Sequence, residues 1–116
     1  MTTLRLRLLF DDLKLGPGKA ELMERIAATG SISAAGRQMQ MSYKRAWMLV
    51  EEMNTAFPTP LIASSRGGAG GGGAHLTDTG KAVLHHFRAL ESAAQTAAAP
   101  HIAALNALHS DMSKQK

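Results

Sequence analysis

The chain has 116 residues, of which 45% are hydrophobic and 19% charged, with no cysteine and a formal net charge of +4. This length fits one domain with a single core, and this composition is typical of a soluble globular protein. The absence of cysteine excludes a disulfide framework, a thiolate zinc site and a cysteine nucleophile. Because no apolar run is long enough to span a bilayer and no export signal is recognisable, we expect a cytoplasmic protein without a membrane partner.

The N-terminal part of the chain predicts a strand and then a helix. Apolar and mostly charged residues alternate over residues 4–10, which is the pattern of a half-buried strand. Residues 10–18 are typical of a turn, and Pro17 suits the first turn of a helix that Gly30 ends. The expected apolar stripe of this helix is Leu22, Met23, Ile26 and Ala27.

Two further helix starts follow in quick succession. Ser31 or Ser33 can cap a short helix, and Ser42 can cap a longer one that Pro58 and Pro60 end. About three residues separate these helices, which is the turn length of a helix-turn-helix. The small Ala34, Ala35 and Gly36 would let the two helices approach closely. The longer helix would turn one face inward: Ala46, Trp47, Val50, Met53 and Phe57.

The C-terminal half predicts a hairpin and a long helix. Residues 61–65 and 74–77 are short strand candidates on either side of a glycine-rich run. Thr77 or Asp78 can cap the last helix, which Pro100 is expected to interrupt before a further helical segment. Its apolar positions are Val83, Phe87, Leu90, Ala94 and Ala97, followed by Ile102, Leu105 and Met112.

The predicted fold class is therefore mainly α with a small β component. The order of elements is that of a winged helix-turn-helix with an extra N-terminal strand and a long C-terminal helix. We expect residues 1–99 to form a DNA-binding domain and residues 100–116 a C-terminal helical extension and tail.

Positive charge is concentrated where such a fold meets DNA. The charged side chains of residues 26–50 and 53–77 are all basic: Arg37, Lys44, Arg45 and Arg66. A recognition helix reads base edges mainly with its N-terminal residues. At that end of the longer helix, the inward face leaves four residues nearer solvent: Tyr43, Lys44, Arg45 and Met48. Arg45 could pair with a guanine edge and Lys44 with phosphate, while Ser42 and Tyr43 could bond either. The alternative is a solvated face behind an ordinary cap.

Two other sets of residues could contact the DNA backbone. Ser31 and Ser33 could bind phosphate through hydroxyls and helix amides, or act only as caps. In the wing, Arg66 and the bare amides of Gly67, Gly68, Gly70 and Gly71 could approach phosphates, the alternative being a disordered loop. The sequence argues against a nucleotide-binding phosphate loop, because the run lacks the Gly-Lys-Ser/Thr ending.

Nothing in the sequence supports an enzyme, a metal site or a cofactor. His85 and His86 are adjacent and point apart on a helix, and His101 and His109 lie two turns apart without identifiable partner ligands. The methionines follow the helix faces, as packing residues do.

The stretches "IAATGSISAAGRQMQMSYKRAWMLVEEMN" and "PLIASSRGGAGGGGAHLTDTG" resemble the N-terminal DNA-binding domain of ModE-type molybdate-responsive transcriptional regulators. The outline of "GS", "AA" and "LT..G" is also similar, more weakly, to the helix-turn-helix of LysR-type regulators. The ModE-type resemblance implies a homodimeric winged helix-turn-helix that dimerises through its N-terminal strand and flanking helices and binds a palindromic operator in double-stranded DNA. Members commonly have Gly in the turn where this chain has Gln40, which would cost roughly 1 kcal/mol in a left-handed conformation.

The leading hypothesis is a sequence-specific transcriptional regulator, connected with molybdenum or another metal-related operon. The resemblance places molybdate binding in additional C-terminal domains, so we expect no sensing by this chain itself and a possible role for a separate sensor protein. The alternative is a protein-interaction module that uses the winged helix and the apolar, Ala-rich residues 93–108. A third reading, an oxyanion binder without regulation, rests on the family name alone.

Overall fold

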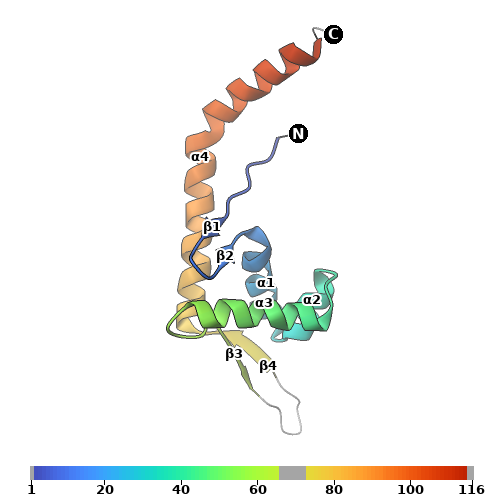
Figure 1. Cartoon of the computed structure of the whole chain (residues 1–116), viewed down its shortest axis with the longest axis vertical. Coiled ribbons are helices and arrows are strands. Elements are labelled where there is room, and N and C mark those ends of the chain that lie inside the picture. The colour runs from blue at the N-terminus through green and yellow to red at the C-terminus, as the bar shows by residue number, and fades with distance from the viewer. Residues whose placement is uncertain (1, 66–72, 115–116) are drawn as a thin grey trace.

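The computed structural model describes residues 2–65 and 73–114, which form four helices and two short antiparallel hairpins (Figure 1). In chain order the elements are β1 (Leu8–Leu9), β2 (Lys14–Leu15), α1 (Pro17–Thr29), α2 (Ile32–Gln38), α3 (Tyr43–Ala56), β3 (Ile62–Ser65), β4 (Gly73–Leu76) and α4 (Asp78–Lys114). The two hairpins are separate sheets, β1 with β2 and β3 with β4. This arrangement confirms the expected winged helix-turn-helix with a long C-terminal helix.

Hydroxyl side chains start three of the four helices. The Ser31 Oγ accepts a hydrogen bond from the Ala34 amide at 3.0 Å, and the Ser42 Oγ accepts one from the Arg45 amide at 3.1 Å. At the start of α4, the Thr77 Oγ1 accepts from the Gly80 amide at 3.0 Å. Each bond satisfies an amide that has no partner within its own helix. The caps are therefore Ser31, Ser42 and Thr77.

One hydrophobic core joins α1, α2, α3, the wing strands and the start of α4. The largest fully buried side chains are Leu22, Met23, Ile26, Met53, Leu61 and Phe87. The expected inward faces need three corrections: Ala27 is exposed, whereas Trp47 and Phe57 are only half-buried. On α3 it is Leu49, absent from the expected stripe, that completes the buried face.

The end of α3, the start of β3 and the start of α4 meet at Leu61. The Asn54 side chain donates to the Ile62 carbonyl and accepts from the amides of Leu61 and Ile62 at 2.9 to 3.0 Å. From the other side, the Thr77 Oγ1 donates to the Pro60 carbonyl at 2.7 Å. A Cβ on Gly80 would lie 2.1 Å from the Leu61 carbonyl oxygen, so only glycine fits there.

The N-terminal strand is much shorter than the alternation over residues 4–10 predicts. Only Leu8 and Leu9 pair, with Leu15 and Lys14, across the turn at residues 10–13. The burial alternation itself is present, because leucines 4, 6 and 8 are half-buried and the residues between them are exposed. Residues 2–4 extend beside α4, where the Thr2 hydroxyl donates to the Asn106 side chain (Figure 1). Packing on a helix replaces strand pairing over this segment.

The expected interruption at Pro100 is wrong, because α4 continues through it to Lys114. A proline inside a helix removes one backbone hydrogen bond and crowds the preceding turn, which bends a helix more often than it ends one of this length. Figure 1 shows such a bend in the C-terminal half of α4. Beyond Leu90 the helix leaves the core, and Leu105 and Leu108 are 63% and 60% exposed.

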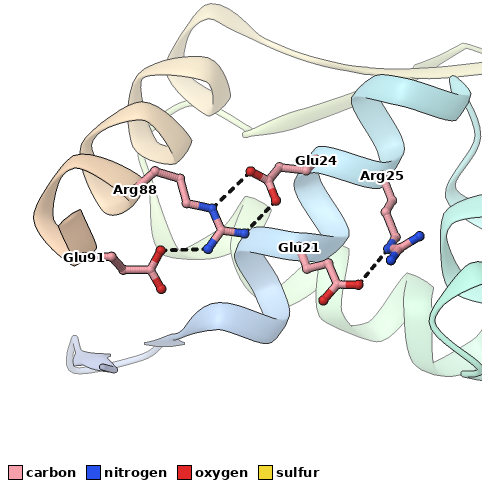
Figure 2. Close-up of polar contacts among 5 residues, drawn as sticks. All are labelled: Glu21, Glu24, Arg25, Arg88 and Glu91. Atoms are coloured by element: carbon pink, nitrogen blue, oxygen red, sulfur yellow. Dashed lines mark hydrogen bonds and ion pairs between the residues drawn. The ribbon is translucent and has the colours of Figure 1, made fainter. Parts of the chain in front are cut away.

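A small ion-pair network ties α4 to α1 (Figure 2). The Arg88 guanidinium donates to both carboxylate oxygens of Glu24, at 2.6 and 3.0 Å, and to Glu91 at 2.7 Å. The hydrogen bond from Arg88 lowers the pKa of Glu24 below its ordinary value and outweighs the opposing effect of burial. The same bonds raise the pKa of Arg88. Bidentate geometry makes this the strongest surface pair between the two helices.

The close approach at Gly80 makes a strong prediction for stability. Gly80→Ala should lower the free energy of unfolding by about 3 kcal/mol, because the new methyl group must displace the Leu61 backbone. Gly18→Ala is the matched control, since a Cβ there meets nothing within 4 Å and should be neutral or slightly stabilising. Urea unfolding followed by circular dichroism measures both. Equal stabilities for the two variants would contradict the Leu61 junction.

The Glu24–Arg88 pair predicts a pH-dependent contribution to stability. Because the pKa of Glu24 is lower in the folded chain, the pair stabilises the fold fully above the unfolded pKa of about 4.3 and loses this effect as the pH falls toward the folded pKa. Glu24→Gln should therefore cost about 0.5–1 kcal/mol at pH 7, where both side chains are partly exposed, and progressively less from about pH 5 to pH 2. Glu21→Gln, which removes an i,i+4 pair with Arg25, is the control and should cost less. A pH-independent cost for Glu24→Gln would argue against this network.

Candidate nucleic-acid interface

The helices α2 and α3 cross at Gly36. A Cβ on Gly36 would lie 2.9 Å from the Ala46 Cβ, closer than real Cβ atoms approach, so the absence of a side chain sets the helix spacing. The connecting turn closes with a hydrogen bond of 3.0 Å from the Met41 amide to the Gly36 carbonyl. Gln40 lies in this turn with φ 58°, the left-handed region that glycine tolerates best. The helix-turn-helix geometry expected from the sequence is thus present, including the strained position.

The first two turns of α3 present one polar and basic face to solvent. Ala46, Leu49 and Val50 are buried against the core. Tyr43 and Met48 are 61% and 48% exposed, and Lys44 and Arg45 are exposed as well. The structure therefore places the predicted reading residues outward, at the end of α3 that follows the turn.

Helical spacing distributes these residues over three sides of α3. At about 100° per residue, Lys44 and Met48 lie at the centre of the exposed face, opposite the core. Tyr43 and Trp47 lie on one flank, and Arg45 and Leu49 lie on the other. The structure thus separates Lys44 from Arg45.

The flank of Tyr43 and Trp47 borders a groove between the helix-turn-helix and the wing, which we name the wing groove. Hydroxyl groups from three elements line it: Ser31, Ser33, Tyr43, Ser64 and Ser65. The rings of Tyr43 and Trp47 meet edge to face with centroids 6.0 Å apart. Ser64 and Ser65 were not predicted as site residues, because the sequence indicates only a strand that leads to the glycine-rich run.

The wing is fixed to the helix-turn-helix at its base. The Ala74 amide donates to the Gly30 carbonyl at 2.9 Å, which places β4 against the end of α1 and beside the Ser31 cap. The strands pair in register from Ile62 with Leu76 to Ser65 with Gly73. The predicted wing contacts lie outside the described residues: Arg66, Gly67, Gly68, Gly70 and Gly71.

The Trp47 indole is a further feature of the wing groove. Its Nε1 atom is buried and, among the described residues, has no hydrogen-bond partner. A buried N–H without a partner costs about 1–3 kcal/mol. Trp47 therefore packs against Tyr43 while its indole N–H lacks a hydrogen bond. The residue is half-buried, whereas the sequence predicts a core residue.

The flank of Arg45 borders a second groove, which we name the arm groove because the N-terminal segment forms one wall. The start of α1 and the α2–α3 turn form the other walls. Its charged lining is entirely basic: Arg5, Arg7, Lys14, Lys19 and Arg45. The alternation over residues 4–10 indicates only that Arg5 and Arg7 lie on the polar side of a strand. Nothing in the spacing of the chain indicates that they line a groove with Arg45.

Other kinds of site find no support in the part of the chain that the structure describes. No three histidine, aspartate or glutamate side chains gather there in a way that could hold a metal ion. Within the same residues, no helix combines the length and the apolar character needed to cross a membrane.

Residues 18–81 match the family of bacterial regulatory helix-turn-helix proteins of the lysR type. This match runs from the first turn of α1 to the first turn of α4, so it contains both helices of the motif and the wing. The chain belongs to this family.

Several relatives of the chain are named for molybdenum. The chain is 40% identical over 83 residues to the molybdenum transport protein ModE of Azotobacter vinelandii, which covers 72% of this chain and 31% of the relative. It is 39% identical over 79 residues to the molybdenum-pterin-binding protein MopB of Rhodobacter capsulatus, covering 68% and 29%. The DNA-binding transcriptional dual regulator ModE of Escherichia coli is 37% identical over 81 residues, covering 70% and 31%. The aligned part thus spans about three-tenths of each relative.

The left-handed Gln40 predicts that glycine is preferred in the turn. Gln40→Gly should raise the free energy of unfolding by about 1 kcal/mol, because the Cβ strain at φ 58° disappears. Gln38→Gly, in the last turn of α2, is the control and should lower it by a similar amount through helix propensity. Thermal and urea unfolding compare the two. A destabilised Gln40→Gly variant would show that the turn is not strained.

Proposed function

We propose that the chain is a sequence-specific regulator of transcription that inserts the N-terminal half of α3 into the major groove of double-stranded DNA. The observation that carries this proposal is the exposed face of α3, where Tyr43, Lys44 and Met48 project beyond a buried core face. The first turn of α3 contains no acidic residue. The major groove admits an α-helix, and the N-terminal residues of a recognition helix contact base edges there.

Ser31, Ser33 and Ser42 support this function from the helix starts. The hydroxyls of Ser31 and Ser42 already accept helix amides, and each retains its own O–H to donate to phosphate. Ser33 lines the wing groove beside Tyr43 without serving as a cap. These residues position the duplex, and Arg66 with Gly67, Gly68, Gly70 and Gly71 would continue the contact into the wing.

The proposed function is DNA binding without catalysis. The molybdenum-related names of the relatives support a role in a molybdenum-related operon. A regulator that binds DNA in this way would act in the cytoplasm. The relatives are longer than the aligned part, which supports a role of residues 1–116 in DNA binding alone. Molybdate would then be sensed outside these residues, for example by a separate sensor protein.

The C-terminal half of α4 supports a homodimer. Residues 1–99 would form the DNA-binding unit, and the helix beyond Pro100 carries Leu105 and Leu108 on one exposed face, away from the core. A helix that projects apolar side chains needs a partner surface, and a two-fold dimer would present two α3 helices to two half-sites. The exposed leucines also suit the alternative function, an interaction module for a different protein.

Lys44 provides the test of the reading helix. Lys44→Ala should weaken binding to the preferred duplex by about tenfold and reduce the slope of log affinity against log salt by about 1, because one phosphate or base contact is lost. Lys81→Ala is the control, an exposed lysine on α4 outside both grooves. Fluorescence anisotropy on a duplex selected from a random pool measures both. Equal binding by the two variants would show that α3 does not read the DNA.

The two leucines provide the test of the dimer. The unaltered chain should sediment as a dimer, and Leu105→Gln with Leu108→Gln should shift it to a monomer at micromolar concentration. The paired changes to Met, which keep the apolar surface, should leave the mass unchanged. A monomeric unaltered chain would refute the homodimer and favour the interaction module.

A further inference from the structure

The arm groove gathers positive charge from separate parts of the chain. Arg5 and Arg7 come from the N-terminal segment, Lys14 from β2, and Arg45 from α3. Lys19, at the start of α1, is the fifth cation of the lining. Among the described residues, no aspartate or glutamate lines this groove.

Ion pairing within the described residues neutralises little of this charge. Lys19 pairs with Glu52 at 3.5 Å, whereas Arg5, Arg7, Lys14 and Arg45 make no ion pair there. Other cations of the chain behave differently, since Arg25 and Arg88 each pair with a carboxylate at 2.7 Å or less. Like charges held together lower stability unless an anion joins them. The groove therefore has the character of a binding surface for a polyanion.

The start of α1 adds to the positive potential of the same groove. The Arg7 guanidinium lies 3.5 Å from the position of a Cβ on Gly16, so it covers the residue before the helix. No side chain caps α1, and its first turn contains no acidic residue. A helix N-terminus left in this state attracts anions. The helix start thus adds to the positive potential, most of which comes from the five cations of the arm groove.

The position of Arg45 connects the arm groove to the DNA interface. Arg45 and Leu49 line the arm groove, while Tyr43 and Trp47 line the wing groove on the opposite flank of α3. A helix seated in a major groove about 12 Å wide has one sugar–phosphate backbone on each side. One backbone would lie along the wing groove, and the other would lie along the arm groove.

We propose that the arm groove binds the phosphates of the DNA backbone on the side of α3 opposite the wing. Arg5, Arg7 and Lys14 contact these phosphates and fix the depth and orientation of α3, and Arg45 contributes to this contact as well as to base reading. This inference rests on the proposed function, because it states which part of the bound duplex contacts the arm groove. The N-terminal segment thereby acquires a DNA-binding role separate from its packing on α4.

Salt-dependent binding tests the proposal directly. The triple variant Arg5→Gln, Arg7→Gln, Lys14→Gln should bind the selected duplex and a random duplex more weakly by the same factor of about tenfold or more, with the salt slope reduced by about 0.9 for each lost phosphate contact. The ratio of the two affinities should not change, because phosphate contacts carry no sequence information. Lys81→Gln removes a charge outside the groove and should leave the slope unchanged.

Two further measurements make the outcome specific to the groove. Arg5→Lys, Arg7→Lys and Lys14→Arg together keep the charge and should retain the salt slope, and circular dichroism checks that each variant is folded. Hydroxyl-radical footprinting of the unaltered complex should show protected backbone on both flanks of the reading helix, and the Gln variant should lose protection on one flank only.

The results separate failure of the inference from failure of the proposed function. If the unaltered chain binds DNA specifically and the folded Gln variant retains its salt slope and both footprints, the inference is overturned and an acidic protein surface becomes the occupant to test. If the unaltered chain binds no duplex above the level of random competitor, the proposed function and the inference fall together.

Discussion

The position of the wing relative to α3 depends on the backbone around Leu61. Asn54, near the end of α3, bonds the Leu61 and Ile62 backbone, and Thr77, before α4, bonds the Pro60 and Leu61 carbonyls. Gly80 provides the space that lets α4 start against the same carbonyl. Side-chain amides and hydroxyls thus satisfy backbone groups at this junction. These bonds connect two sides of the candidate interface, α3 and the β3–β4 wing.

The candidate interface differs in charge and shape on the two flanks of α3. Lys44 and Met48 lie at the centre of the exposed face of α3, with a hydroxyl-lined groove on one flank and a basic groove on the other. The chemistry of the two grooves differs: one offers neutral O–H donors beside an aromatic pair, and the other offers cations from the N-terminal segment. A duplex is recognised through both kinds of contact, since hydroxyls and cations each bond phosphate oxygens. α4 extends away from this surface with its apolar end exposed (Figure 1).

Local signals in the sequence predicted most of the fold. Caps at Ser31, Ser42 and Thr77 and the glycine at the α2–α3 crossing each follow from neighbours close in the chain. The left-handed turn at Gln40 was implied by the resemblance to ModE-type regulators. The length of the strand over residues 4–10 and the break at Pro100 were wrong, because each depends on what the segment packs against. A segment that lies on α4 needs no strand partner, and a long helix tolerates one missing bond.

The candidate site was predictable only in part for the same reason. The exposure of Tyr43, Lys44, Arg45 and Met48 follows from helical periodicity, and the structure bears it out. The place of Arg45 in a basic groove follows only from knowing what borders each flank of α3. The same holds for Ser64, Ser65 and the arginines of the N-terminal segment, which reach the grooves through contacts between distant parts of the chain. Sequence spacing carries no information on such contacts.

The central claim is that this surface recognises a particular DNA sequence. The most direct test is selection of binding sites from a random duplex pool with the purified chain, followed by fluorescence anisotropy on the enriched duplex with random DNA as competitor. The account predicts an enriched sequence motif, binding that survives the competitor and a steep decline of affinity with salt. Enrichment of no motif, with weak binding that the competitor abolishes, would contradict it.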